Sequence, residues 1–335
     1  MKDDELKETC KEVFASGITV TTDQASYLEE CTKLQSQSLV WIEHRTGRIT
    51  ASKFLAVKRA SLHPPPASLV RQLMNRTGSL SHVPAIQWGI EHEEVARNAY
   101  IESASECHDN FSCAASGLHV NPCYPHLGAT PDGLIECDCC GEGVLEIKCP
   151  FKHRDKHPHE AVLDPQFCLR KDEDGMVYLS NSHEYYYQIQ GQLAVCDKEF
   201  CDFVCWTPCG IHMERILADP HHFSETKVAL DRFFLQVMLP LLLTGQKEVT
   251  SIDDQIRNTG PRDSKASASH SDSLDGASCS QDKKFCWCNG EDVGKMVGCD
   301  NSNCPREWFH YDCVGIKRKP RGKWYCSNSC KKSRV

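Results

Sequence analysis

The sequence predicts an α/β (α+β) protein in which helices flank a mixed central sheet, followed by a small zinc-stabilised finger. Three observations favour this architecture. Strand-like and helix-like segments alternate over about 200 residues. A stretch rich in Ser, Ala, Asp and Gly, residues 263–282, then contains almost no large apolar side chains, which is typical of a disordered linker. Cysteines beyond it recur at metal-ligand spacing.

The predicted elements follow the hydrophobic pattern along the chain. Residues 22–34 and 87–101 have apolar positions at helical spacing, and Pro64-Pro65-Pro66 interrupts helix formation between them. Short strands around two turns are predicted for residues 127–150. The remaining elements are a helix over residues 183–196, a strand over 200–206 and a large helix over 224–243.

These patterns divide the chain into four predicted segments. They are an N-terminal helical extension (1–37), the main α/β domain (38–245), a disordered linker (246–282) and the finger (283–332).

We expect an intracellular protein that does not enter a membrane. The most apolar stretch, Phe233–Leu243, contains Pro240 and is too short to span a bilayer. The first five residues lack the apolar segment of a signal peptide. Seven of the 22 cysteines fall in the C-terminal metal pattern. The other fifteen are expected to be free and mostly buried thiols, because the cell interior is reducing.

Charge is divided unevenly along the chain. From Lys283 onward there are 12 basic and 5 acidic residues, whereas the first 282 residues carry 26 basic and 41 acidic ones. Bulk attraction to nucleic acid is therefore excluded for the larger part. Any contact with DNA there requires a local basic groove.

Two carboxylates and a lysine form a chemical pattern in the main domain. Pro131-Asp132-Gly133 is a turn, and Glu146 follows thirteen residues after its glycine. Glu146 and Lys148 point to one face of a strand, and a hairpin can bring Asp132 beside them. Converging carboxylates make an oxygen site for Mg²⁺, and a lysine can help to activate water for phosphodiester hydrolysis. An exposed Glu146–Lys148 salt bridge is the structural alternative.

The surrounding residues favour the nuclease interpretation. Leu145–Phe151 resembles the core motif of the phage-lambda exonuclease (YqaJ-like viral recombinase) family. Four further blocks resemble that family in the same order: Arg45–Ser52, Trp88–Glu93, Thr130–Gly133 and Tyr185–Gln190. The resemblance covers about residues 38–240. It implies a restriction-endonuclease-like fold and metal-dependent digestion of linear duplex DNA from a 5′ end.

The resemblance also implies roles for individual residues. Asp132, Glu146 and the backbone carbonyl of Ile147 are expected to bind Mg²⁺ or Mn²⁺, and Lys148 to assist the nucleophilic water. Three further catalytic or DNA-contacting positions are Glu93, which binds the water shell of a second metal or orients the nucleophile, Gln188, which braces the site, and Tyr185, beside the DNA.

A pocket for the 5′-phosphate of the cut strand is implied in the same way. Its matching residues are Arg45, Ser52, Thr130 and Arg154. An arginine suits this role because its fork of donors can grip a terminal phosphate. Solvated surface charges are the alternative for Arg45 and Arg154.

The loop of the predicted hairpin carries Cys137, Cys139 and Cys140. Three cysteines this close could form a small additional zinc site. The sequence places no clear fourth ligand nearby, so unligated thiols remain the alternative.

The C-terminal segment contains eight metal-ligating residues: Cys286, Cys288, Cys299, Cys304, His310, Cys313, Cys326 and Cys330. Their spacings fit two tetrahedral Zn²⁺ sites. A segment of about 50 residues can bury little apolar core, so metal binding is expected to supply most of its folding free energy.

The order of these ligands, with Trp324 two residues before Cys326, resembles a PHD finger of the inhibitor-of-growth family. The resemblance implies interleaved sites, with Cys286, Cys288, His310 and Cys313 on one zinc and Cys299, Cys304, Cys326 and Cys330 on the other. It also implies binding of histone H3 trimethylated on lysine 4. The matching positions are Phe285, Met296 and Trp308 for the trimethylammonium cage, and Asp300 and Glu307 for a histone arginine. A purely structural role for Met296 and Trp308 is the alternative.

The sequence therefore predicts a metal-dependent DNA exonuclease joined to a reader of histone tails. Its expected partners are double-stranded DNA ends and the histone H3 tail, and its expected location is the nucleus. The alternative is a catalytically silent protein that binds DNA and chromatin. The sequence leaves the oligomeric state open.

Overall fold

The computed structural model describes residues 3–75, 83–245, 296–301, 304, 308–311, 314, 316, 320, 322–326 and 330–331. The chain divides into two compact units, one of residues 1–76 and 81–252 and one of residues 77–80 and 253–335. The predicted linker, residues 246–282, lies outside the described residues.

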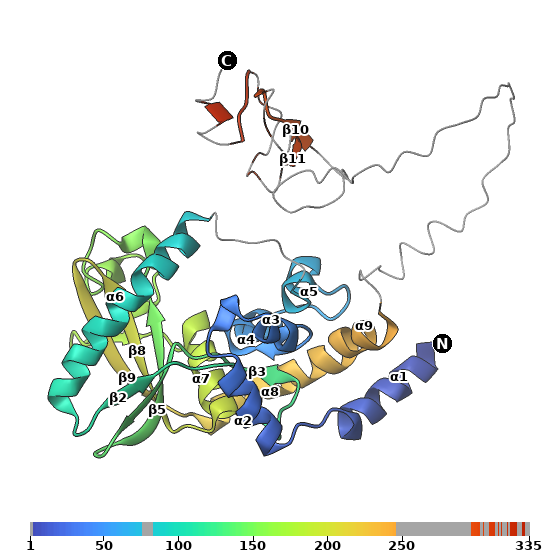
Figure 1. The fold of residues 1–335 in the computed structure, drawn as a ribbon, viewed down its shortest axis with the longest axis horizontal. Helices are drawn as coiled ribbons and strands as arrows, with labels where there is room; N and C mark the ends of the chain where they lie inside the picture. The colour runs from blue at the N-terminus through green and yellow to red at the C-terminus, as the bar shows by residue number, and fades with distance from the viewer. Residues whose placement is uncertain are drawn as a thin grey trace, which may run out of the picture. The chain divides into compact units, whose positions relative to one another are not determined.

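A five-stranded mixed sheet forms the centre of the first unit (Figure 1). In order across the sheet, its strands are β2 (Ser112–Ala114), β4 (Gly133–Cys137), β5 (Gly141–Lys148), β8 (Phe200–Thr207) and β9 (Gly210–Leu217). The central strands β5 and β8 are parallel, and all other neighbours are antiparallel. The predicted mixed sheet flanked by helices is confirmed.

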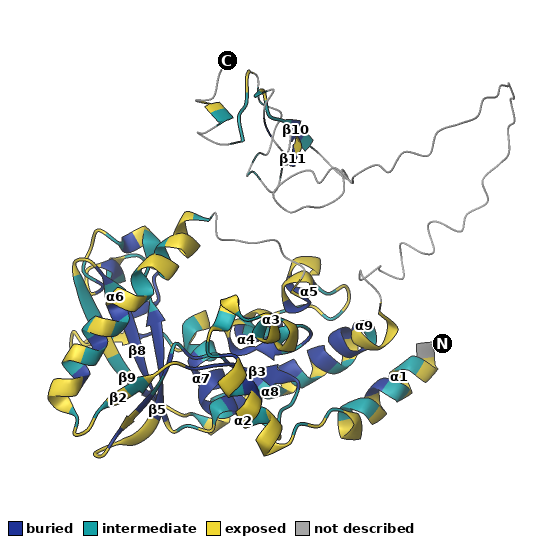
Figure 2. Cartoon of the chain, viewed as in Figure 1, coloured by how far each residue is buried: buried dark blue, intermediate teal, exposed yellow. Residues whose placement is uncertain are grey.

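One long helix packs on each face of this sheet. On one face, Ala96 and Tyr100 of α6 (Pro84–Cys107) contact the apolar cluster that includes Leu145. On the other face, Ile189 of α7 (Glu184–Cys196) belongs to the cluster that includes Val144. The strand β8 between them is buried over almost its whole length (Figure 2). Because side chains alternate along β5, Glu146 and Lys148 lie on the face that α7 covers.

Most of the remaining helices of the first unit surround a further apolar cluster that includes Phe54 and Phe233. The helices are α1 (Asp3–Glu12), α2 (Thr22–Cys31), α3 (Leu39–Arg45), α4 (Phe54–Lys58), α5 (Ala67–Leu73), α8 (Pro220–Phe233) and α9 (Leu239–Thr244). Two small sheets pair β1 (Ile49–Thr50) with β3 (Leu127–Gly128) and β6 (Leu169–Lys171) with β7 (Val177–Leu179). Among the described helices, none combines the length and the apolar character needed to cross a bilayer.

The structure corrects two expectations. The helix predicted for residues 224–243 begins earlier, at Pro220, because the Asp219 side chain caps it and accepts a hydrogen bond from the His222 amide. It is also divided by a π-helical turn, Phe234–Met238. The cysteines of the first unit are free, as expected, but they are not mostly buried. The exposed ones are Cys31, Cys107, Cys123, Cys139, Cys140 and Cys209.

The second unit contains a short antiparallel pair, β10 (Met296–Gly298) and β11 (Trp308–His310). Val297 and Phe309 pair across it, and both are buried in a small cluster that includes Trp324. Among the described residues of this unit, the apolar cluster has only three buried members, Val297, Cys304 and Phe309.

Candidate active site and metal centres

The β4–β5 hairpin places Asp132 beside Glu146. Gly133 pairs with Leu145, and the Asp132 amide donates to the Leu145 carbonyl at 2.9 Å, so the antiparallel register puts Asp132 opposite Glu146. The Ile147 amide donates to Oδ2 of Asp132 at 2.6 Å, which fixes this carboxylate at the strand edge. The structure therefore brings together the two acidic residues of the predicted metal site.

Glu146 is a buried carboxylate surrounded by donors. The Glu146 residue is only 1% exposed to solvent. Lys148 Nζ and Gln188 Nε2 both donate to Oε1, the latter at 2.5 Å. Gln192 Nε2 donates to Oε2 at 2.6 Å. Because an unpaired buried carboxylate is costly, these three donors explain how a charge persists here. The exposed salt bridge considered as an alternative is not what the structure contains.

The electrostatics of this cluster suit a divalent cation. Burial and the neighbouring charge of Glu146 raise the pKa of Asp132 well above its usual value. Burial lowers the pKa of Lys148, but the charges of Glu146 and Asp132 outweigh it and raise that pKa overall. Two carboxylates that repel one another in a buried place are relieved by a hard cation. Asp132, Glu146 and the Ile147 carbonyl are the groups that could hold it.

Glu93 reaches this site from α6 through an arginine. Arg97 Nη2 donates to Oε1 of Glu93 at 3.0 Å, and Arg97 Nη1 donates to the backbone carbonyl of Asp132. Arg97 thus links the helix to the turn before β4. Arg97 was not predicted as a site residue, although its position four residues after Glu93 on a predicted helix favours a contact between the two side chains.

The helix α7 supplies the other side of the site. Gln188 and Gln192 lie one turn apart on it, and both donate to Glu146. The Tyr185 ring lies 4.8 Å from Lys148 Nζ and covers the ammonium group. Gln188 and Tyr185 were predicted from the sequence, but Gln192 was not. Gln192 lies four residues after Gln188 on the predicted helix, and this spacing places both side chains on the same face.

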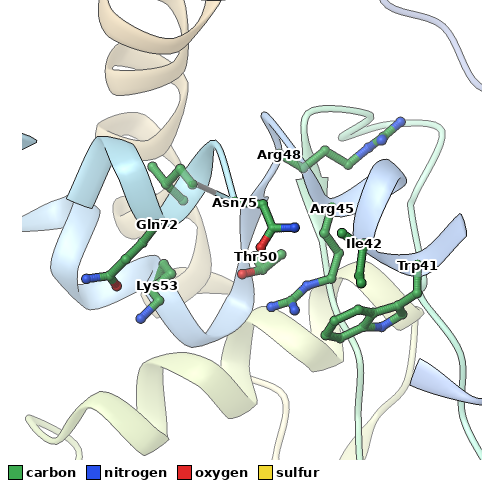
Figure 3. Close-up of a pocket in the computed structure, with 9 residues that line it drawn as sticks. Trp41, Ile42, Arg45, Arg48, Thr50, Lys53, Gln72 and Asn75 are labelled. Carbon is green, nitrogen blue, oxygen red and sulfur yellow. The ribbon is translucent and has the colours of Figure 1, made fainter. Parts of the chain in front are cut away.

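A basic pocket lies between α3, α5 and the segment after β1 (Figure 3). Its polar lining comprises Arg45, Arg48, Thr50, Lys53, Gln72 and Asn75. The Arg45 guanidinium stacks on the Trp41 ring at 3.9 Å. Only Arg45 was identified from the sequence. Arg48 and Lys53 lie in and directly after the Arg45–Ser52 block, which was the available signal for a basic pocket.

The pocket suits an anion because its cations are desolvated and not neutralised. Burial lowers the pKa of Arg45 to about 10. Burial also lowers the pKa of Lys53, against the opposing charge of Glu184 and with a smaller contribution from the charge of Arg45. The Nε of Arg45 is buried without a hydrogen-bond partner among the described residues. Within that same part of the chain, no carboxylate forms an ion pair with Arg45, Arg48 or Lys53. A buried guanidinium with an unused donor is stabilised strongly when a phosphate binds, because the phosphate supplies both the missing acceptor and the opposite charge.

The pocket is connected to the carboxylate site through Trp41. Its Nε1 donates to Oγ1 of Thr130 at 3.1 Å, and Thr130 lies two residues before Asp132. Ser52 Oγ lies 3.4 Å from Oγ1 of Thr50, which lines the pocket. Arg154 is not a lining residue; it stacks on Phe151 at 4.4 Å. Three of the four residues predicted to hold a 5′-phosphate thus lie in or beside one pocket.

In the finger, Cys299, Cys304, Cys326 and Cys330 gather so that their Sγ atoms all lie within 4.8 Å of one another. Cys326 Sγ is 3.7 Å from Cys304 Sγ and 3.4 Å from Cys330 Sγ. These four are the set that the PHD resemblance assigned to a single zinc. The other predicted ligands, Cys286, Cys288, Cys313 and the His310 side chain, lie outside the described residues.

Two of the predicted cage residues lie on the paired strands of the finger. Met296 pairs with His310 and Gly298 with Trp308, so Met296 and Trp308 project to one face with the side-chain-free Gly298 beside them. Trp308 is 48% exposed. Asp300 Oδ2 accepts a hydrogen bond of 2.6 Å from the Trp324 amide. Phe285 and Glu307 lie outside the described residues.

The main domain matches a known family. Residues 40–199 match the model of the YqaJ-like viral recombinase domain. The alkaline exonuclease LHK-Exo of Laribacter hongkongensis has a TM-score of 0.44 and 24% identity, covering 62% of this chain and 97% of that one. The Shutoff and Exonuclease Protein of Kaposi's sarcoma-associated herpesvirus has a TM-score of 0.43 and 12% identity, covering 73% of this chain and 77% of that one.

The finger at the C-terminal end matches curated proteins. Protein YNG1 of Saccharomyces cerevisiae is 57% identical over 51 residues, 15% of this chain and 23% of that protein. Inhibitor of growth protein 1 of Mus musculus is 60% identical over 42 residues, 12% of this chain and 15% of that protein. The chain thus spans less than a quarter of the length of these relatives.

Proposed function

We propose that this chain is a metal-dependent deoxyribonuclease. It carries a YqaJ-like viral recombinase domain at residues 40–199 and an inhibitor-of-growth-like PHD finger. The observation that carries the proposal is the buried Glu146 carboxylate, which faces Asp132 and accepts a hydrogen bond from Lys148. A structural ion pair does not need a second carboxylate beside the first, whereas a site for a catalytic cation does.

Each residue of the site has a distinct task. A bound Mg²⁺ or Mn²⁺ acts as a Lewis acid and lowers the pKa of water. Asp132, Glu146 and the Ile147 carbonyl hold the cation. Lys148 remains protonated because the two carboxylates raise its pKa, so it orients the attacking water and stabilises negative charge on the phosphate.

The surrounding residues position this centre. Gln188 and Gln192 fix the two oxygens of Glu146. Glu93, held by Arg97, faces the site from α6 and accepts hydrogen bonds from water at the reacting phosphate. Tyr185 covers Lys148 and presents its ring to the DNA strand.

The basic pocket favours digestion from a 5′ end. Arg45 offers a buried Nε that has no hydrogen-bond partner among the described residues, and Lys53 adds a second positive charge, which suits a terminal phosphate better than an internal diester. The Trp41–Thr130 hydrogen bond joins the pocket to the segment that ends at Asp132. A strand whose 5′-phosphate occupies the pocket therefore passes close to the carboxylates. The substrate we propose is linear duplex DNA, cut in the 5′-to-3′ direction.

The finger is proposed to read histone H3 trimethylated on lysine 4. Met296 and Trp308 share one face of the β10–β11 pair, and the exposed indole offers its ring to a quaternary ammonium. The four gathered cysteines supply one of two proposed Zn²⁺ sites. A histone reader acts on chromatin, so the proposed location is the nucleus.

The decisive experiment compares digestion of linear 5′-phosphorylated duplex DNA and of a closed circle, with and without Mg²⁺. We expect metal-dependent shortening of the linear substrate only, and its loss in Glu146→Ala and Lys148→Ala. Glu136→Ala is the matched control, because Glu136 is an exposed glutamate of the same hairpin. If folded wild-type protein cuts neither substrate in Mg²⁺ or Mn²⁺, the binding-only alternative replaces the nuclease.

A further inference from the structure

One histidine and three cysteines gather at the turn of the β4–β5 hairpin. A nitrogen of His108 and the Sγ atoms of Cys137, Cys139 and Cys140 all lie within 4.8 Å of one another. His108 directly follows the last residue of α6, 29 positions before Cys137. The hairpin thus brings to the three neighbouring cysteines a fourth ligand that lies far from them in the sequence.

Most distances within this cluster are close to the edges of a zinc tetrahedron, and one is shorter. His108 Nδ1 lies 3.1 Å from Cys139 Sγ and 3.6 Å from the Sγ atoms of Cys137 and Cys140. Cys139 Sγ lies 3.5 Å from Cys137 Sγ and 3.7 Å from Cys140 Sγ. Zn–S bonds of about 2.3 Å and Zn–N bonds of about 2.0 Å give tetrahedral edges of about 3.5 to 3.8 Å. A disulfide requires an S–S distance of about 2.05 Å, so these sulfurs are not paired.

Hydrogen bonds beside the cluster hold its two segments together independently of a metal. The Asp138 amide donates to the Asp109 carbonyl at 3.0 Å. The Asn110 side-chain amide donates to Oδ2 of Asp138 at 2.6 Å. The chain after α6 and the hairpin turn are therefore fixed to one another by contacts that do not involve the four ligands. A site prepared in this way loses less conformational entropy when an ion binds.

We infer that His108, Cys137, Cys139 and Cys140 bind a structural Zn²⁺. Three thiolates and one imidazole form a closed four-coordinate set, which suits zinc and leaves no position for a reacting water. The ion ties the end of α6 to the β4–β5 hairpin. The first of these elements carries Glu93, and the second connects Asp132 to Glu146, so the ion fixes their relative placement.

Zinc content of the full chain tests this inference. We expect the double variant Cys139→Ser with Cys140→Ser to contain one zinc ion fewer per chain than wild type. Cys123→Ser is the matched control, because Cys123 is exposed and lies outside the cluster, and it should leave the zinc content unchanged. His108→Cys replaces one zinc ligand by another and should also retain the ion. Equal zinc content in wild type and the double variant overturns the inference.

A measurement on unaltered protein covers the case in which the double variant does not fold. Cys139 and Cys140 are exposed, as is Cys123, so exposure alone predicts similar rates of alkylation. In the zinc-loaded protein we expect Cys139 and Cys140 to react much more slowly than Cys123, and a chelator to remove this protection. Alkylation of all three at the same rate before and after chelation overturns the inference. Neither measurement depends on nuclease activity, so the proposed function can fail without affecting this result.

Discussion

Gln192 donates its side-chain amide to Oε2 of Glu146 at 2.6 Å, and both residues are buried. The hydrogen bond connects the middle of α7 to the central strand β5. Gln192 Oε1 is buried without a partner among the described residues, so the amide is held in place chiefly by the carboxylate. A buried amide whose oxygen has no hydrogen-bond partner lowers the stability of the fold. Such a residue is typical of a site where the side chain positions a functional group.

We expect Gln192→Leu to weaken the metal site. The substitution removes the donor to Oε2 and leaves the Glu146 carboxylate free to turn. Loss of a residue that orients a metal ligand typically costs about 10- to 100-fold in metal affinity or activity. Cleavage rates measured across a Mg²⁺ titration should show a raised half-saturating concentration. An unchanged titration would mean that Gln192 does not position the metal ligand.

Arg45→Gln should reduce the preference for phosphorylated ends. Wild type is expected to digest duplexes with a 5′-phosphate faster than those with a 5′-hydroxyl. Loss of one charged hydrogen bond, worth about 1.5–3 kcal/mol, lowers kcat/KM on phosphorylated ends roughly 10- to 100-fold. The rate on hydroxyl ends should change much less. Arg232→Gln, an exposed position on α8, is the control. An equal decrease in kcat/KM on both kinds of end would show that Arg45 does not recognise the 5′-phosphate.

Gly191→Ala should destabilise the first unit. A Cβ at this position of α7 would lie 2.5 Å from Cε2 of Phe54, whose buried ring cannot move freely. Overpacking of this kind costs about 1–3 kcal/mol. Gly89→Ala on α6 is the matched control, because its Cβ would meet nothing within 4 Å. That variant should be neutral or stabilised by up to about 1 kcal/mol. Urea unfolding measures both, and equal effects would contradict the packing argument.

His119 should make the protein less stable in mild acid. Burial, with a smaller contribution from the charge of Lys198, lowers the pKa of His119 to about 4. The unfolded chain takes up this proton near pH 6.5 and the folded chain only near pH 4. The contribution of neutral His119 to the free energy of unfolding is therefore fully present above pH 6.5. It is lost as the pH falls toward 4, by about 3 kcal/mol in all.

The test for His119 is a comparison of variants. His119→Gln can keep the hydrogen bond to Ser116, which is 3.1 Å long, but does not titrate. Its free energy of unfolding should fall less between pH 7 and pH 5 than that of wild type. Parallel pH dependences in the two proteins would assign the acid sensitivity to other groups.

Trp308→Ala should remove most of the discrimination between histone peptides. Wild type is expected to bind an H3 peptide trimethylated on lysine 4 more tightly than the unmodified peptide. A cation–π contact of about 0.5–2 kcal/mol corresponds to roughly 2- to 30-fold in Kd. The variant should bind both peptides with similar affinity and retain its zinc. A preserved difference between the peptides would give Trp308 a structural role only.

The sequence determined the local features of this protein. The spacing of Glu146 and Lys148 places both on one face of a strand in any sheet, and the turn at Asp132 leads directly into the hairpin that opposes them. The cysteine spacing of the finger likewise predicted metal ligands, and the structure gathers the four thiols that the resemblance to a PHD finger assigns to one zinc. Such features depend on a few neighbouring residues and on fixed backbone geometry, so they can be read along the chain.

Only the tertiary structure decided which distant residues complete each site. Gln192 became a neighbour of Glu146 when α7 packed on β5, and His108 met its cysteines only when the hairpin folded beside the end of α6. These contacts join residues separated by tens of positions. Their formation depends on the packing of whole helices against the sheet, which is set by the sum of many weak apolar contacts and not by any local motif.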